Sequence, residues 1–289
     1  MEPMAADVAS ALRAFLADAD ASHAALRDAE DPAAFVAQLL LSPIDPVAAV
    51  SASDVLLSLP IGVAYVDQLA AVIADWFVSQ RSPLVDQPSP VSGVGVLSTS
   101  YERVLAVNFR VIQEAVEALR VRFLLSDVVS VLHQGSIEQH DAIVGLIEAI
   151  GGARGVMTCL GFRETTGSRT VLPLTREQCL DAFLQPNSSK EKLTVGARAF
   201  TKHCQRSSDG FWGELKGNDL MKNATARARL EQLLDTAVWK NVHSLPHGEE
   251  TFEIRNSDGY GARWYVQDQS FRGFLEPHME NGHENRWRH

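Results

Sequence analysis

Along the first 79 residues, apolar side chains recur at intervals of three and four, which is the spacing of amphipathic helices. The segments "EDPAAFVAQLLL" and "GVAYVDQLAAVIADWFV" show the pattern most clearly. Asp31 followed by Pro32 is a typical helix start, because aspartate caps the free amides and proline fits the first turn. We therefore predict a helical N-terminal region over residues 1–79.

The helical pattern then stops in "SQRSPLVDQPSPVSGVGVLSTS", a stretch rich in proline, serine and glycine. Such composition is typical of a linker or a long surface loop. We predict a linker over residues 80–98, and with it the main domain boundary of the chain.

Residues 99–187 are predicted to form a second, mainly helical domain. A long helix over 101–125 is followed by two shorter ones that each begin at a serine (126 and 136) and end at a glycine (135 and 151). "ARGVMTCLGF" predicts another helix, and "FRETTGSRTVLPL" predicts a short β-hairpin. Thr175 and Gln178 form a capping-box pattern at the start of the last helix.

The C-terminal region, residues 188–289, predicts a different architecture. A helix begins at the capping pattern of Ser188, and a long helix covers residues 220–243. Three strands follow, "ETFEIRN", "GYGARWYV" and "SFRGFLEP", the first pair joined at an Asp-Gly turn. The predicted fold class is α+β: a helical N-terminal two-thirds, and a C-terminal domain of two helices and a three-stranded antiparallel meander.

Charge and cysteine content narrow the function classes. The chain has 289 residues and a net charge of −10, yet from Ser188 onward it carries 15 basic and 14 acidic residues. The acidic remainder disfavours general binding to phosphate backbones, so we predict no nucleic-acid partner. The three cysteines are widely spaced, and neither a signal peptide nor a membrane-spanning stretch is recognisable. We expect a soluble protein of the cytoplasm or nucleus, with no membrane partner.

Alternation along the predicted strands separates an apolar face from a charged one. The apolar set is Phe252, Ile254, Ala262, Trp264, Val266, Phe271 and Leu275. The other set is Glu253, Arg255, Arg263, Tyr265, Arg272, Phe274 and Glu276. Two interpretations of the charged face stay open. One is a solvated ladder of cross-strand ion pairs. The other is a site for an anionic small ligand, since arginine binds carboxylate and phosphate with two parallel hydrogen bonds.

Histidines are concentrated in the same region. His243 and His247 stand four residues apart, but Pro246 prevents them from sharing a regular helix. His278 and His283 follow at a spacing typical of loops. No spacing here is diagnostic of a metal site, so these four residues are only the best metal-ligand candidates, and we predict neither metal nor cofactor.

The chain ends in "GHENRWRH", in which Trp287 is the third residue from the end of the sequence. Burial of its ring would contribute about 1.5–3 kcal/mol, so we expect it to cover the apolar sheet edge near Phe274 and Leu275. A lid over a ligand is the alternative.

The order of elements around "GGARGVMTCLGF…VLPL" resembles a PUB domain over roughly residues 100–185. In that family a helix ending in glycine is followed by a helix ending in Leu-Gly-Phe and a hairpin closing on Leu-Pro. The corresponding residues here are Gly152, Leu160, Gly161, Phe162, Leu172 and Pro173. The resemblance implies binding of the C-terminal tail of the Cdc48/p97 ATPase, in the context of the ubiquitin system.

The groove that binds this tail in the family uses an asparagine, and a phenylalanine three residues later. These positions fall on His140 and Ile143, a difference expected to weaken or retune tail binding. The C-terminal region is also similar to an uncharacterised family of plants and bacteria, through "GYGARW", "GFLEP" and "WRH". That family carries no activity to transfer.

The sequence therefore predicts, first, a non-enzymatic adaptor. Its PUB-like domain would dock a protein tail through His140 and Ile143, and its C-terminal domain would bind an anionic ligand through Arg255, Arg263, Arg272, Glu276 and Trp287. The alternative is an enzyme acting on an anionic substrate, with an Arg/Glu/His active site in the C-terminal domain.

Overall fold

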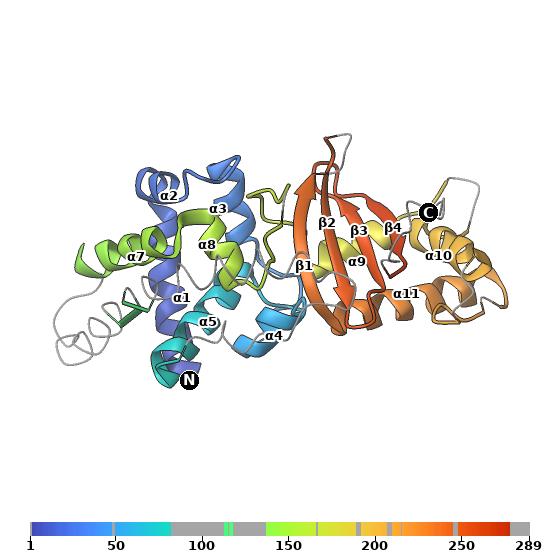
Figure 1. Cartoon of the computed structure of the whole chain (residues 1–289), viewed down its shortest axis with the longest axis horizontal. Coiled ribbons are helices and arrows are strands. Elements are labelled where there is room, and N and C mark those ends of the chain that lie inside the picture. The colour runs from blue at the N-terminus through green and yellow to red at the C-terminus, as the bar shows by residue number, and fades with distance from the viewer. Residues whose placement is uncertain are drawn as a thin grey trace.

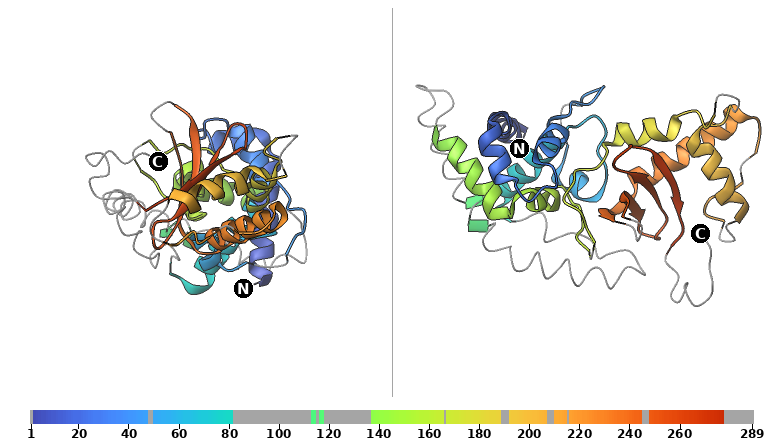
Figure 2. Two further views of the ribbon diagram at one scale, coloured as in Figure 1. Left: turned by 90° about the vertical axis from the view of Figure 1, so that its right-hand side faces the viewer. Right: turned by 90° about the horizontal axis from the view of Figure 1, so that it is seen from above.

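The computed structural model describes two packed parts, a helical one and one built on a β-sheet (Figure 1). Seen from above, they lie side by side along the long axis of the molecule (Figure 2). The described residues are 2–47, 50–81, 113–114, 116–117, 137–165, 167–188, 192–206, 210–214, 216–244 and 248–277.

The helical part begins as the apolar periodicity predicts. Its helices are α1 (Glu2–Ala17), α2 (Ala19–Ala25), α3 (Pro32–Leu40), α4 (Ala52–Leu57), α5 (Tyr65–Ser79), α7 (Ile137–Ile150) and α8 (Gly152–Cys159). The predicted start at Asp31 is confirmed, because its carboxylate accepts a 3.0 Å hydrogen bond from the amide of Ala34. Helix α1 packs against α5 and α7, so helices from both sides of the predicted linker share one core. The linker, residues 80–98, lies almost entirely outside the described residues.

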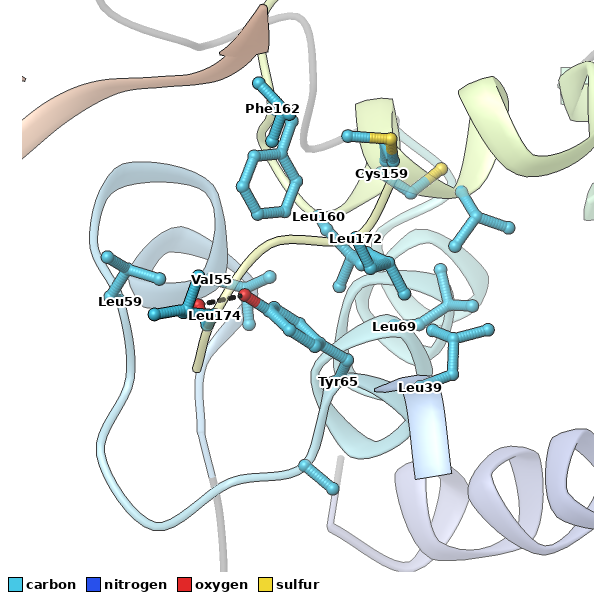
Figure 3. Close-up of a cluster of buried hydrophobic side chains, with 14 of the residues drawn as sticks. Leu39, Val55, Leu59, Tyr65, Leu69, Cys159, Leu160, Phe162, Leu172 and Leu174 are labelled. Atoms are coloured by element: carbon cyan, nitrogen blue, oxygen red, sulfur yellow. Dashed lines mark hydrogen bonds between the residues drawn. The ribbon is translucent and has the colours of Figure 1, made fainter. Parts of the chain in front are cut away.

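The residues that resemble a PUB motif are core residues of this helical part. Figure 3 shows Leu160, Phe162 and Leu172 gathered around Tyr65, whose hydroxyl donates a 3.0 Å hydrogen bond to the carbonyl of Leu174. Gly161 has a φ of +81°, and a Cβ there would lie 2.5 Å from the carbonyl oxygen of Leu56. Close packing of the chain accounts for this motif.

The N-terminus of α8 is held by a residue from the loop after α2. The carboxylate of Asp28 accepts hydrogen bonds from the amides of Ala153 (2.7 Å) and Arg154 (2.9 Å). A Cβ at Gly152 would lie 2.2 Å from this carboxylate, so the glycine is needed for the approach of Asp28.

His140 and Ile143 lie on α7 and contact other helices. Ile143 is fully buried, and the His140 imidazole lies 3.7 Å from the Asp18 carboxylate and beside the ring of Phe15. The position expected to receive a tail residue at Ile143 is thus filled by the protein's own core.

The segment between α8 and α9 crosses from the helical part to the sheet. The amides of Arg163 and Arg169 donate 2.8 Å hydrogen bonds to the carbonyls of Lys240 and Val242. This pairing with a strand far along the chain replaces the predicted local hairpin.

The second part confirms the predicted α+β class, with a four-stranded antiparallel sheet in the order β1-β2-β3-β4. Its elements are α9 (Arg176–Leu184), α10 (Val195–Arg206), α11 (Asp219–Asp235), β1 (Ala237–Ser244), β2 (Glu250–Asn256), β3 (Gly261–Tyr265) and β4 (Phe271–Leu275). The capping box of Thr175 and Gln178 is confirmed at α9.

The meander has one strand more than predicted, because the predicted long helix over 220–243 ends at Asp235 and its last turns form β1. "AVWKNVHS" contains β-branched and aromatic residues that suit a strand, and pairing with β2 satisfies their backbone groups. The helical spacing of the preceding residues extended the prediction too far.

The two faces of the sheet differ as predicted, up to a bulge in β4. Phe252, Ile254 and Trp264 point to the buried face, which α9 and α11 cover. Phe271 pairs with Trp264 but Gly273 pairs with Arg263, so Arg272 is an extra residue. The bulge reverses the predicted alternation, and Phe274 packs against Phe200 on the buried side.

Among the described residues, no single helix is long and apolar enough to cross a membrane. The helices His140–Ile150 and Gly152–Cys159, bent by 85° relative to each other, reach the length and apolar composition of a membrane span only when they are taken together.

Candidate functional site

The face of the sheet that α9 and α11 do not cover, here called the polar face, carries a buried carboxylate at its centre. Asn241, Glu253 and Arg263 pair across β1, β2 and β3, which places their side chains in one row. Glu253 accepts hydrogen bonds from Arg255 Nε (2.5 Å) at Oε1 and from Arg263 Nε (2.6 Å) at Oε2. The Nε2 atom of His243 lies 3.1 Å from the same Oε2. The structure thus brings together three of the predicted charged residues and His243.

The charge of Glu253 is stabilised by these neighbours. Burial alone raises the pKa of a carboxyl group, but the hydrogen bond with His243 and the charges of Arg255 and Arg263 outweigh it here. The pKa of Glu253 therefore lies well below its usual range. Glu253 is therefore an anion at neutral pH, and it fixes the three side chains around it.

These side chains differ in their access to solvent. Glu253 and Arg255 are each 3% exposed, whereas His243 is 17% and Arg263 is 22% exposed. Arg255 is also held by the carbonyls of Gly259 and Glu276. His243 and Arg263 are therefore the members of the cluster that a ligand can reach.

Arg272 and Tyr265 extend the polar face toward β4. The Arg272 guanidinium lies over the Tyr265 ring, 5.3 Å from its centroid, and is exposed. The bulge at Arg272 is the reason that this side chain emerges beside Tyr265. A second accessible guanidinium thus stands near the edge of the sheet.

Glu276 does not share the polar face, contrary to the predicted alternation. Its carboxylate accepts a 2.7 Å hydrogen bond from Trp212 Nε1 and lies 3.2 Å from His203 Nδ1 on α10. Only its backbone reaches the cluster, through the 3.0 Å bond from Arg255 Nη1. The displacement follows from the extra residue in β4.

Sequence reasoning missed the polar residues that reach β1 from the helical part. The Asn241 side chain donates to Thr165 Oγ1 and accepts from Ser168 Oγ, both at 3.0 Å. Asn241 was assigned to a helix, so its place beside Glu253 could not be recognised. If "AVWKNVHS" is treated as a strand, its alternation places Asn241 and His243 on the same face of the sheet.

The metal-ligand candidates do not come together within the described residues. His243 lies on a strand, and no group of three or more histidine, cysteine, aspartate or glutamate side chains in the described ranges could hold a metal ion. His247, His278, His283 and Trp287 lie outside those ranges.

Residues 184–276 match the family model of the CdiA C-terminal tRNase toxin domain. The match covers about a third of the chain and runs from the end of α9 to just beyond β4, so it contains the whole Glu253 cluster. No curated protein and no solved structure matches the chain.

This match corrects the sequence-based identification. The chain is similar to a tRNase toxin domain and not to a PUB-domain protein, so the predicted adaptor role and ubiquitin-system context are wrong. The apolar residues of the PUB-like motif pack in the core around Tyr65. Such core packing is common to many helical proteins. The same match also replaces the predicted resemblance of the C-terminal region to an uncharacterised plant and bacterial family.

The predicted partners are corrected for the same reason. A family named for action on tRNA contradicts both a Cdc48/p97 tail as partner and the exclusion of nucleic acid. The exclusion relied on net charge, but the acidic excess belongs to residues before Ser188, and the matched region is nearly neutral. The alternative prediction, an Arg/Glu/His enzyme site in the C-terminal region, agrees better with the match.

Proposed function

We propose that residues 184–276 form an endoribonuclease that cleaves tRNA at the polar face of the sheet. The observation that carries the proposal is the Glu253 carboxylate, bound by Arg255, Arg263 and His243 inside the matched segment. Buried acid–base clusters with strongly perturbed ionisation are typical of active sites.

The chemistry available to this cluster suits cleavage of RNA by its own 2′-hydroxyl. The 2′ oxygen attacks the adjacent phosphorus, a 2′-O–P bond forms and the P–O5′ bond breaks. The 2′-hydroxyl loses a proton and the leaving 5′ oxygen gains one. The products are a 2′,3′-cyclic phosphate and a 5′-hydroxyl, and no other reactant is consumed.

Each accessible side chain has a role in this reaction. His243 protonates the leaving oxygen, since histidine is the side chain that most often transfers protons in enzymes and the ring is oriented by Glu253. Arg263 binds the phosphate and neutralises the charge that develops on it. The 2′ proton passes to solvent water, while the buried Glu253 stays ionised and keeps His243 and Arg263 in place.

The buried Arg255 keeps this arrangement in place. It holds Oε1 of Glu253 and is itself bound by two backbone carbonyls. It therefore positions the carboxylate and leaves Oε2 directed toward His243 and Arg263.

The test is incubation of the full chain with total tRNA, followed by denaturing electrophoresis and analysis of the fragment ends. We expect fragments with 2′,3′-cyclic phosphates, and no cleavage of DNA of the same sequence. His243→Ala should lower the rate by about 10²–10⁴-fold, the usual contribution of a proton-transfer residue. The matched control is His23→Ala on α2 in the helical part, which should cleave normally. Full activity of His243→Ala, or an intact tRNA pool with the wild-type chain, would refute the proposal.

A further inference from the structure

Helix α10 presents positive charge on its outer side. Its buried positions are occupied by Ala197 and Phe200, whereas Arg198 and Lys202 are exposed one turn apart. The helix contains no aspartate or glutamate. Within the described residues, neither Arg198 nor Lys202 forms an ion pair, so both are available to an external anion.

The position of α10 relates this charge to the candidate site. Figure 1 shows α10 beyond β4, at the end of the molecule opposite the helical part. Phe200 of α10 packs on Phe274 of β4, with ring centroids 5.6 Å apart. On its inner side His203 contacts the Glu276 carboxylate, and the carbonyl of Glu276 binds Arg255 of the cluster. The helix is thus a direct neighbour of the site.

The opposite border of the sheet adjoins the part of the chain that carries the net negative charge. Strand β1 adjoins the helical part, and residues 1–187 carry 11 basic and 22 acidic residues. Phosphates are repelled from that side and attracted toward the exposed arginine of β4 and the basic side of α10.

We infer that the tRNA strand leaves the active site across β4, with successive phosphates on Arg272, Lys202 and Arg198. The inference rests on the proposed function and adds the direction and the second contact surface of the substrate. Four residues of α-helix advance by about 6 Å, so Lys202 and Arg198 offer two separate contacts along one strand. A substrate long enough to pass β4 uses them, and a dinucleotide held at the Glu253 cluster does not.

The experiment compares the wild-type chain with the double variant Arg198→Ala/Lys202→Ala. The control is Lys222→Ala/Arg227→Ala, which removes two positive charges from α11, the helix that covers the buried face of the sheet. We measure kcat/KM for tRNA and for a dinucleotide, and the salt dependence of tRNA binding in a His243→Ala background, where the tRNA stays intact. Circular dichroism melting confirms that each variant is folded.

The α10 double variant should cleave tRNA roughly three- to tenfold less efficiently, mainly through KM, and should cleave the dinucleotide like the wild type. Its slope of log Kd against log salt should be smaller by about 1.5, because two phosphate contacts are lost. Wild-type tRNA binding and slope in this variant, or an equal loss in the α11 control, would overturn the inference. If the wild-type chain cleaves neither substrate, the proposed function fails, and the difference in salt slope still decides whether α10 binds the RNA.

Discussion

Glu253 and Arg255 lie two residues apart on β2, so both side chains leave the same face of the sheet, where Arg255 Nε donates a 2.5 Å hydrogen bond to Glu253 Oε1. Both side chains are buried, and each carries a full charge that is costly to bury alone. Removal of either partner should therefore destabilise the sheet as well as disturb the proposed chemistry. Variants here must be judged by folding and activity together.

Glu253→Gln should lower the free energy of unfolding by about 3–5 kcal/mol at neutral pH, because it leaves buried guanidinium groups without their counterion. Glu231→Gln on α11, whose carboxylate pairs with the exposed Arg227, should change it by less than about 0.5 kcal/mol. Urea unfolding measures both. Equal stability of the two variants would show that the Glu253 cluster contributes nothing to folding.

The same carboxylate should make the protein sensitive to acid. Since the pKa of Glu253 is lower in the folded chain than its ordinary value of 4.5, its contribution to stability is complete above about pH 4.5 and is lost as the pH falls further. Between pH 4.5 and pH 2.5, the unfolding free energy of the wild type should therefore fall more steeply than that of Glu253→Gln. Parallel slopes would contradict this assignment.

Arg263→Lys should keep the fold and lose activity, because lysine retains the charge but not the planar pair of donors. Loss of one charge-assisted hydrogen bond to phosphate is worth about 1.5–3 kcal/mol, or roughly a ten- to hundredfold fall in kcat/KM for tRNA. Arg227→Lys is the control. A variant that cleaves tRNA as well as the wild type would remove Arg263 from the phosphate site.

Lys240 should make the junction between the two parts dependent on pH. Its ammonium group donates to the carbonyls of Val55 and Ser58 at the end of α4, and burial, with a smaller effect of Arg163, lowers its pKa to about 7. The unfolded chain binds more protons than the folded one between about pH 7 and the ordinary lysine pKa of 10.5, so this residue's contribution to stability rises with pH across that range.

The comparison that checks it is Lys240→Met, which removes the titrating group. The unfolding free energy of the wild type relative to this variant should rise from pH 7 to pH 10, by at most about 1.4 kcal/mol per pH unit. A difference that stays constant with pH would mean that Lys240 keeps its proton throughout.

Gly196→Ala should destabilise the sheet part by about 1–3 kcal/mol, because a Cβ there would lie 2.1 Å from the ring of Phe183. Gly145→Ala in α7 is the matched control, since a Cβ there has no atom within 4 Å. It should stabilise the helical part by about 0.5–1 kcal/mol, the difference between glycine and alanine in a helix. Melting temperatures that shift in the same direction would contradict the packing described here.

Local features of the sequence were enough to predict the N-terminal helices and the α+β class. Asp31 caps α3, and Thr175 with Gln178 caps α9, through contacts within three residues. Glu253, Arg255 and Arg263 were assigned correctly to one face because strand alternation needs no knowledge of distant residues.

The tertiary structure decided what depends on distant partners. Strand β1 exists because "AVWKNVHS" pairs with β2 and with Arg163 and residues 167–169, and this pairing outweighs the helical spacing that precedes it. The bulge at Arg272, set by the pairing of β4 with β3, turned Phe274 and Glu276 toward α10. The place of His243 beside Glu253 follows from the same β1–β2 register, and no spacing along the chain encodes it. Local propensity therefore determined the elements, and long-range pairing determined which side chains meet at the site.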